Sequence, residues 1–371
     1  MSTEPGQPRG GVHSARRPSR LRRAAAALAA LLLAGAALEG AFRLLAPRLG
    51  WEPVELEHFR HYVITGEHPW YQPHPYVGYV LRPEHPNANA LGFSDDDHPL
   101  ERTPGVPRIA CLGASTTEGG NAAGRRGAYP TFLAAALEER LGRPVEVMNW
   151  GLSGWTSAEV QANYFLNIEA YRPDVVILHL GANDVEARLW PGYRRDYAHF
   201  RRPWHDLRFG FANRLLVRAS RGYSALLLRR AKNFTIQNLV NRPLEDGPLL
   251  VDGGLAPGTT AGFRANLRRV LRAAAADGAH GVLATLPYAP HPGEYSGGEL
   301  FAPGVDDHNE VMRELAAELG CTLVDLAEWF GRPETGGQGE FVDLVHVTPE
   351  GNRLKAERIA EALLEAGLLE P

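Results

Sequence analysis

Three side chains in the sequence could together activate a hydroxyl group for attack on a carbonyl carbon. Ser115 follows Gly113-Ala114 at the end of an apolar run, where a strand is expected to turn into a helix and expose the hydroxyl. Serine is a weak nucleophile until a base takes its proton, and a histidine base needs a carboxylate to orient its ring. Asp343 and His346 lie three residues apart in the segment FVDLVHVTPEG and can supply that pair. These residue types predict a nucleophilic serine with a histidine base.

Two further residues could stabilise the negative charge that such an attack creates. Gly154 and Asn183 each follow a run that reads as a buried strand. A backbone NH at a glycine and a side-chain amide can approach an oxyanion closely without adding charge of their own. Taken singly, each is better explained as an ordinary turn or cap residue. Their place after consecutive strands, downstream of the serine, favours an oxyanion hole made by Ser115, Gly154 and Asn183.

A glycine-flanked turn between a strand and a helix is also typical of phosphate-binding loops. That motif needs a Lys followed by Ser or Thr after its last glycine. The segment GASTT at 113–117 has no such ending. The turn at Ser115 is therefore not interpreted as a nucleotide site.

The catalytic residues require a framework, and the sequence from residue 107 onward provides one. Short apolar runs alternate with longer amphipathic stretches, which indicates a parallel sheet with crossover helices. The expected strands are 108–113, 145–150, 174–180, 281–286 and 322–326. The expected helices are 129–141, 157–171, 260–276, 305–319 and 349–366, the last with Thr348 as its N-cap. Because parallel strands end at one edge of a sheet, the candidate residues are expected to converge there.

Two segments do not follow this alternation. Residues 51–106 are rich in Pro, His and aromatic residues, and we interpret them as an accessory lead-in whose histidines lack metal-ligand spacing. Residues 186–258 read as an insertion into the domain that carries the candidate residues and spans 107–371. Between 186 and 232 the insertion carries eleven Arg and one Lys against three acidic residues, with helical apolar spacing from 213 to 232. It could be a lid, a surface for anionic headgroups or an acidic polymer, or a helical layer packed on the domain, and the last is favoured.

The amino terminus has the pattern of a membrane anchor. Residues 1–23 are basic and rich in Pro and Gly, and we expect them to be disordered. The uncharged run 24–38 has the length of a signal-peptide core, whereas the apolar stretch 24–46 reaches the roughly 20 residues that a spanning helix needs. Glu39 and Arg43 interrupt it four residues apart and could pair. We favour a single-pass anchor with the basic side in the cytoplasm and the remainder outside the cytoplasm. Secretion after signal cleavage and a soluble alanine-rich helix are the alternatives.

Composition excludes several other classes of function. A net charge of -4 over 371 residues gives no reason to expect nucleic acid as a partner. Cys111 and Cys321 both lie in apolar segments that read as core strands, so neither a disulfide framework nor a metal cluster is indicated.

The order and local contexts of Ser115, Gly154, Asn183 and His346 resemble those of the four residues that name the SGNH, or GDSL, hydrolases. Asp343 also stands three residues before the histidine, as in that family. The resemblance covers roughly 108–364 apart from the insertion, and its last block is the specific one. The family signature Gly-Asp-Ser-Leu reads Gly-Ala-Ser-Thr at 113–116, so an aspartate outside the triad is replaced by alanine. The lead-in segments GYVLR and NALGF resemble those of bacterial members tethered by one amino-terminal helix.

This resemblance implies a fold, an activity and a set of partners. The implied fold is a flavodoxin-like three-layer αβα sandwich with a five-stranded parallel sheet. The implied activity is hydrolysis of esters, acylated sugars or lipids through an acyl-enzyme, with no metal and no organic cofactor. We therefore expect a serine-dependent ester hydrolase that acts outside the cytoplasm on a small-molecule, glycan or lipid ester. An O-acetyltransferase of an envelope polysaccharide and a non-catalytic, membrane-tethered binding module are the alternatives.

Overall fold

The computed structural model describes residues 20–50, 56–119, 124–204, 209–230, 237–242, 250–251, 254–256, 258–295 and 297–369. Most of the segment 1–23 therefore lies outside the described residues. The chain divides into two compact units. One unit combines Met1–Thr65 with Phe209–Lys232, and the other combines Gly66–Arg208 with Asn233–Pro371.

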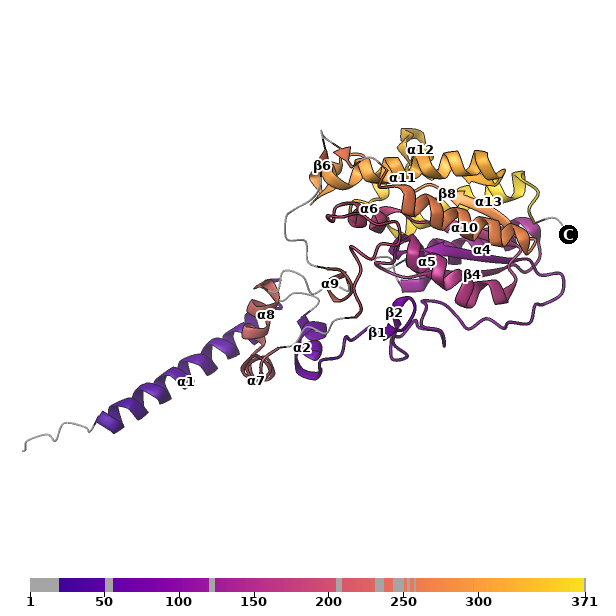
Figure 1. Ribbon diagram of the computed structural model, residues 1–371. Helices are drawn as coiled ribbons and strands as arrows, with labels where there is room; N and C mark the ends of the chain where they lie inside the picture. The colour runs from indigo at the N-terminus through magenta and orange to yellow at the C-terminus, as the bar shows by residue number, and fades with distance from the viewer. Residues whose placement is uncertain are drawn as a thin grey trace, which may run out of the picture. The chain divides into compact units, whose positions relative to one another are not determined.

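The larger unit is built on a five-stranded parallel sheet with the order β4-β3-β5-β8-β9. Its strands are β3 (Arg108–Gly113), β4 (Glu146–Gly151), β5 (Val175–His179), β8 (His280–Ala284) and β9 (Thr322–Val324). Two of these strands, β4 and β8, are labelled in Figure 1. Within this sheet β4, the second of its strands in chain order, lies at one edge, and β3, the first, lies beside it. This is the order of flavodoxin-like sheets. The expected parallel sheet is confirmed, and each of its strands ends within two residues of the predicted position.

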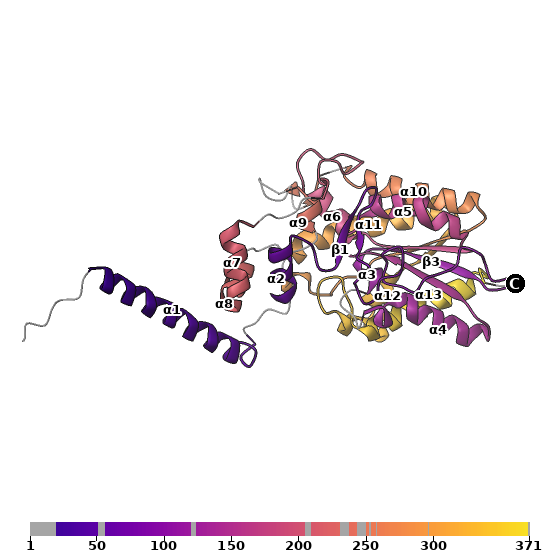
Figure 2. The same cartoon turned by 90° about the horizontal axis from the view of Figure 1, so that it is seen from below.

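Helices cover both faces of this sheet and make the three expected layers (Figure 2). One face carries α4 (Tyr129–Leu141), α12 (Leu326–Gly331) and α13 (Pro349–Glu365), and the other carries α5 (Ser157–Asn163), α10 (Ala261–Ala276) and α11 (Gly298–Leu319). Ile109 and Ile177 point from the strands into a fully buried core with Leu133 of α4 and Ile359 of α13. Apolar residues at alternate strand positions therefore fix α4 and α13 on the sheet.

Two predicted helices differ from the observed ones. The helix expected at 157–171 is α-helical only to Asn163, and continues as a π turn (Tyr164–Ile168) and a 3-10 turn (Glu169–Tyr171). The helix expected to begin at residue 305 begins at Gly298 and keeps Pro303 within it. Proline usually ends a helix, and the sequence pattern therefore placed the start too late. Thr348 caps α13 as expected, since its hydroxyl accepts a hydrogen bond from the NH of Gly351 at 3.1 Å.

The lead-in and the insertion contribute smaller elements to the same unit. In the lead-in, β1 (Tyr71–His74) pairs antiparallel with β2 (Gly78–Leu81). The insertion begins within α6 (Ala182–Arg188) and contains α9 (Gln237–Val240), β6 (Leu250–Val251) and β7 (Gly254–Leu255). The strands β6 and β7 are too short to give a recognisable apolar run.

The smaller unit is helical. It consists of α1 (Arg20–Leu45), α2 (Leu56–Thr65), α7 (Phe211–Ala219) and α8 (Arg221–Arg230). The long helix α1 has the length and apolar character of a membrane span or a signal sequence. Within it, Arg43 donates to Glu39 at 2.6 Å, so the pair expected from the sequence forms. The helical spacing expected from 213 to 232 is divided into two helices, because Ser220 has an extended backbone.

The two cysteines are free thiols. Cys111 lies in β3, and burial raises the pKa of its thiol to about 12. Cys321 precedes β9 and is partly exposed, so the expectation that both thiols lie inside core strands is correct for Cys111 only.

Candidate active site

The turn after β3 places Ser115 at the carboxyl edge of the sheet. Ser115 is the first residue of the short helix α3 (Ser115–Glu118). A Cβ atom at Gly113 would collide with the Thr117 side chain and the backbone oxygen of His179, so the tight turn requires glycine there. The Thr117 hydroxyl donates to that same oxygen at 3.0 Å and fastens the helix to β5. Ser115 therefore sits on a short, braced turn with its side chain partly exposed.

The loop 341–347 places His346 and Asp343 before α13. One antiparallel bridge closes the loop, and the NH of Val342 donates to the oxygen of His346 at 2.9 Å. Asp343 Oδ1 accepts from the NH groups of Val345 at 3.0 Å and His346 at 2.8 Å. These local bonds hold the carboxylate in place beside the His346 ring.

The structure brings Ser115, His346 and Asp343 into one hydrogen-bonded chain. His346 Nε2 lies 2.7 Å from Ser115 Oγ, and His346 Nδ1 lies 2.8 Å from Asp343 Oδ2. A carboxylate at Nδ1 keeps the proton on that nitrogen, which leaves Nε2 to accept the proton of the serine hydroxyl. Partial burial alone would raise the pKa of Asp343, but the hydrogen bonds from His346 and Val345 outweigh it and lower the pKa. Asp343 is therefore ionised at neutral pH.

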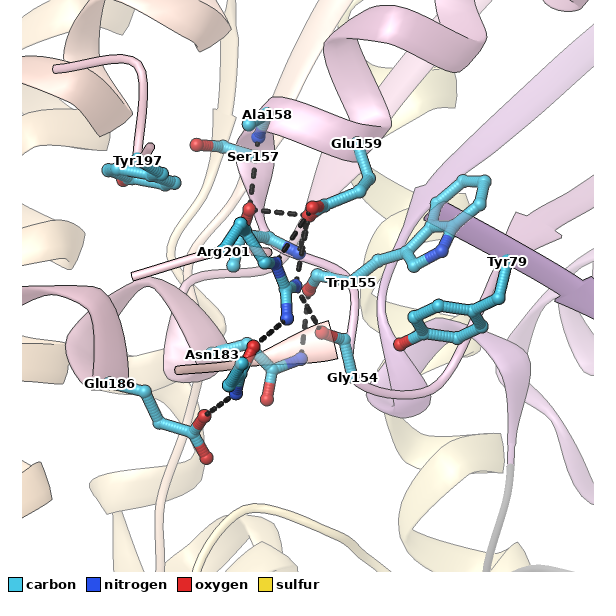
Figure 3. Close-up of polar contacts among 12 residues, drawn as sticks. Tyr79, Gly154, Trp155, Ser157, Ala158, Glu159, Asn183, Glu186, Tyr197 and Arg201 are labelled. Carbon is cyan, nitrogen blue, oxygen red and sulfur yellow. Dashed lines mark hydrogen bonds and ion pairs between the residues drawn. The ribbon is translucent and has the colours of Figure 1, made fainter. Parts of the chain in front are cut away.

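A hydrogen bond joins Asn183, in the first turn of α6, to the loop that carries Gly154. Gly154 has a φ of 79°, in the region that glycine adopts without strain. Asn183 lies on α6, and its side-chain amide donates to the backbone oxygen of Trp155 at 2.8 Å (Figure 3). This bond uses one of the two amide hydrogens and leaves the other for a second acceptor. The loop that carries Gly154 is therefore tied directly to Asn183.

The comparison with protein families identifies the class of this chain. The profile of the GDSL-like lipase/acylhydrolase family matches residues 111–354, which is more than half of the 371 residues. The chain belongs to this family. It is therefore a carboxylic ester hydrolase, and the resemblance to the GDSL hydrolases and the fold class predicted from the sequence are confirmed.

Solved structures with a similar fold include three esterases or related enzymes. A lipase/acylhydrolase from Enterococcus faecalis is 16% identical and covers 70% of this chain and 97% of its own length, with a TM-score of 0.43. The acetylxylan esterase Axe2 from Geobacillus stearothermophilus is 17% identical, with coverages of 69% and 94% and a TM-score of 0.43. The α/β hydrolase LAE5, from the metagenome of Lake Arreo, Spain, is 19% identical, with coverages of 71% and 97% and a TM-score of 0.42. No curated protein matches the sequence.

This GDSL-family chain also holds a buried carboxylate next to the candidate nucleophile. Glu118 lies on the same short helix as Ser115, and it accepts hydrogen bonds from the Ser153 NH at 2.7 Å and from the Ser153 hydroxyl. Burial raises its pKa above the usual value in spite of these bonds. Tyr79 of β2 donates to the Ser153 oxygen at 2.6 Å. The lead-in and α3 thus fix the residue that precedes Gly154.

A partly buried arginine of the insertion, Arg201, holds the other side of Gly154. Arg201 Nη2 donates to the Gly154 oxygen at 2.8 Å, and Arg201 Nε pairs with Glu159 at 2.8 Å (Figure 3). A third bond joins Arg201 to the Asn241 amide oxygen. Glu159 also accepts from the NH and the hydroxyl of Thr156, as part of the capping box that starts α5. The guanidinium therefore links the insertion, the Gly154 loop and the first turn of α5.

A second buried carboxylate lies next to Asn183. Asp184 accepts from the Ser157 hydroxyl at 2.5 Å and from the Tyr197 hydroxyl at 2.7 Å. Burial raises its pKa to about 6, although these hydrogen bonds act in the opposite direction. Asp184 thus joins α6 to the start of α5, and the loop that carries Gly154 leads directly into α5.

Sequence reasoning did not find the residues that support the site. Glu118 gave one signal, an acidic residue three positions after the serine. Tyr79 and Arg201 gave none, because nothing in the local pattern shows which aromatic residue of the lead-in or which basic residue of the insertion will reach the sheet edge.

Proposed function

We propose that this ester hydrolase acts through Ser115 as nucleophile, His346 as general base and Asp343 as the group that orients the histidine. One observation carries the proposal: His346 lies within hydrogen-bond distance of both the serine hydroxyl and the aspartate, at 2.7 and 2.8 Å. This is the geometry that a base needs to take a proton from an alcohol while its ring is held by a carboxylate.

In the acylation step, the proton of Ser115 moves to His346 Nε2 as Oγ bonds to the ester carbonyl carbon. The electron pair of the carbonyl bond moves to its oxygen. The NH groups of Ser115 and Gly154 and the amide of Asn183 are the donors proposed for that oxyanion. When the bond from carbon to the alcohol oxygen breaks, His346 returns the proton to the departing alcohol. The acyl group then remains on Ser115.

In the deacylation step, water takes the place of the alcohol. His346 removes a proton from the water as the water oxygen bonds to the acyl carbon, and the same donors stabilise the second oxyanion. The bond to Ser115 Oγ breaks, the proton on His346 passes to Oγ, and a carboxylic acid leaves. No step needs a metal or an organic cofactor.

The same proposal places the hydrolase outside the cytoplasm, held to the membrane by α1. The apolar helix is preceded by several arginines, and basic flanks stay on the cytoplasmic side of a membrane. A membrane-impermeant maleimide should therefore label an exposed position of the larger unit, such as Glu139→Cys on α4, in intact cells. Labelling only after cell lysis would contradict this location.

The catalytic proposal is tested by turnover of a short p-nitrophenyl ester in detergent. Ser115→Ala removes the nucleophile without adding bulk, and the wild-type circular dichroism spectrum and melting temperature should be kept. Turnover should fall by on the order of 10³-fold or more. Turnover by Ser115→Ala within a few-fold of the wild type would eliminate Ser115 as the nucleophile.

A further inference from the structure

The helix pair α7–α8 is fastened to α1 through Glu39. The Glu39 carboxylate accepts from the Ser220 hydroxyl at 2.7 Å, from the NH of Arg221 at 2.8 Å and from the NH of Gly222 at 3.2 Å. The NH groups of a first helical turn have no partner within the helix, and a carboxylate there satisfies them. The start of α8 is therefore fixed at the position of Glu39 along α1.

Glu39 marks one end of the uncharged part of α1. The run 24–38 before it contains no charged residue, and its leucines are strongly exposed, with Leu33 at 72% and Leu38 at 71%. If α1 spans the membrane, as the proposed function holds, these leucines face lipid. Glu39 and Arg43 lie in the last turns of the apolar stretch 24–46 and then belong near the outer boundary of the hydrocarbon layer, where their side chains can reach the interface, since charge is costly deeper within the layer. The start of α8 consequently lies at the level of the lipid headgroups.

The inner side of the α7–α8 pair is covered by α2. Arg60 of α2 donates to the Val217 oxygen at 2.6 Å and to the Ser224 hydroxyl at 2.8 Å. Val217 is completely buried. On the same inner side, the Tyr223 hydroxyl donates to the Asn213 side chain at 2.7 Å. The inner side of the helix pair α7–α8 therefore packs against residues of the same unit.

The opposite side of α7 is apolar and exposed. Phe211, Leu215 and Leu216 are 83%, 55% and 44% exposed. Phe211, Leu215 and Ala219 follow one another at intervals of four residues and form a row along the helix. Val217 lies on the other side of the helix, so the exposed apolar row is not an extension of the buried face. A helix with a second, outward apolar face requires a partner for that face.

Basic residues flank this apolar row. Arg214 and Arg218 are four residues apart and exposed, and they lie between the apolar row and the buried face. The sequence contains no Asp or Glu between Asp206 and Glu245. Apolar residues beside arginines are the pattern of helices that lie in the surface of a membrane with anionic lipids.

We propose that α7 is an interfacial helix that lies in the outer leaflet beside α1. Phe211, Leu215 and Leu216 enter the boundary of the acyl chains, and Arg214 and Arg218 contact anionic headgroups. A lipid surface is favoured over a protein partner because Glu39 already holds the helix pair α7–α8 at the edge of the hydrocarbon layer. The inference rests on the membrane location of α1 and adds a second membrane contact, made by the insertion.

The test uses the full chain in vesicles of phosphatidylcholine with phosphatidylglycerol. Cys321→Ser removes the partly exposed native thiol in every variant, and buried Cys111 is kept. An environment-sensitive NBD fluorophore is attached to Leu215→Cys on α7, to Leu32→Cys in α1, or to Glu139→Cys on α4. Nitroxide lipids with the spin label near the headgroup or near the chain end then quench fluorophores at those depths.

The Leu215 label should lose roughly half of its fluorescence to the headgroup nitroxide and little to the chain-end nitroxide. The Leu32 label should show the reverse order, and the Glu139 label should be unaffected. Arg214→Glu combined with Arg218→Glu should reduce quenching at the Leu215 label, because both charges that contact anionic headgroups are reversed. This reduction should be largest in vesicles that contain phosphatidylglycerol.

Different failures identify different errors. If the Leu32 label is quenched at depth but the Leu215 label behaves like the Glu139 label, the interfacial helix is wrong and the anchor stands. If the Leu215 label is blue-shifted but not quenched by either lipid, a protein covers the apolar face and the inference is overturned. If the Leu32 label is not quenched either, the membrane location itself is wrong, and the inference is lost with it.

Discussion

His346 Nε2 lies 2.7 Å from Ser115 Oγ although 231 positions separate the two residues in the sequence. The parallel sheet explains this approach, because β3 ends at Ser115 and the loop before α13 returns to the same edge. Buried residues of α4, α13 and β3 pack in one core, and this packing fixes the position of α13 and of the loop before it relative to the sheet. A substitution of Ser115 or His346 should therefore lower activity without unfolding the sheet.

Replacement of Asp343 by Asn should lower kcat by between about 10²- and 10⁴-fold, because the amide no longer selects the productive tautomer of His346. The fold should be unaffected, since the Asp343 side chain is 43% exposed. The measurement is kcat and KM for p-nitrophenyl acetate. Asp277→Asn, at an exposed position after α10, is the matched control and should keep wild-type rates. Equal rates for the two variants would show that Asp343 has no part in the reaction.

Asn183→Ala should reduce kcat by about 10²- to 10³-fold with little change in KM, because an oxyanion donor acts mainly in the transition state. The same change removes the bond to the Trp155 oxygen, so the melting temperature must be recorded beside the rates. Asn167→Ala, which loses a bond to the Asn163 side chain instead, is the control for a lost amide. A rise in KM with unchanged kcat would mean that Asn183 binds the substrate but does not stabilise the oxyanion.

The sequence was sufficient for the framework because the framework depends on local patterns. The central strands β3 (Arg108–Gly113) and β5 (Val175–His179) are buried on both faces and therefore appear as apolar runs. The positions of Ser115, Asp343 and His346 followed from residue types that few other functions require together. Gly154 and Asn183 followed from their place after strands.

The surroundings of the site could not be predicted because they depend on contacts between distant segments. The bond from Arg201 to the Gly154 oxygen joins residues 47 positions apart, and the sequence showed only one basic residue among many. The grouping of α2 with α7 and α8 was equally hidden, since Arg60 and Val217 are 157 positions apart. Helix starts were misjudged where proline lies inside the helix, as at Pro303.

Arg201 is expected to be a positioning residue for the Gly154 loop. Lysine cannot donate to Gly154, Glu159 and Asn241 at once, because it lacks the planar fork of the guanidinium. Arg201→Lys should therefore lower kcat by between about 10- and 100-fold while KM stays near the wild-type value. Arg194→Lys, at an exposed ion pair of the same insertion, should change neither constant. A lower melting temperature with unchanged kcat would assign Arg201 to stability alone.

Titration of Asp184 should lower the free energy of unfolding as pH rises. Its pKa in the folded chain is about 6, above the usual 3.8, so folding favours the protonated carboxyl. The stability that this group contributes is full below about pH 4 and is lost as pH rises through 6, by about 1.4 kcal/mol for each unit of pKa difference. Asp184→Asn cannot titrate. The unfolding free energy of the wild type minus that of Asp184→Asn, from urea titrations in detergent, should decline between pH 4 and 7. A difference that is constant or rises over this range would contradict the burial of an ionisable Asp184.

The most direct test of the catalytic account is covalent trapping by a fluorophosphonate, followed by intact-mass and peptide mass spectrometry. The reagent is attacked by an activated serine and leaves a stable phosphonyl group on its oxygen. We expect one such group per chain, located on Ser115, with no adduct on Ser115→Ala and much slower labelling of His346→Ala. A wild-type chain that stays unmodified, or an adduct located on another serine, would contradict it.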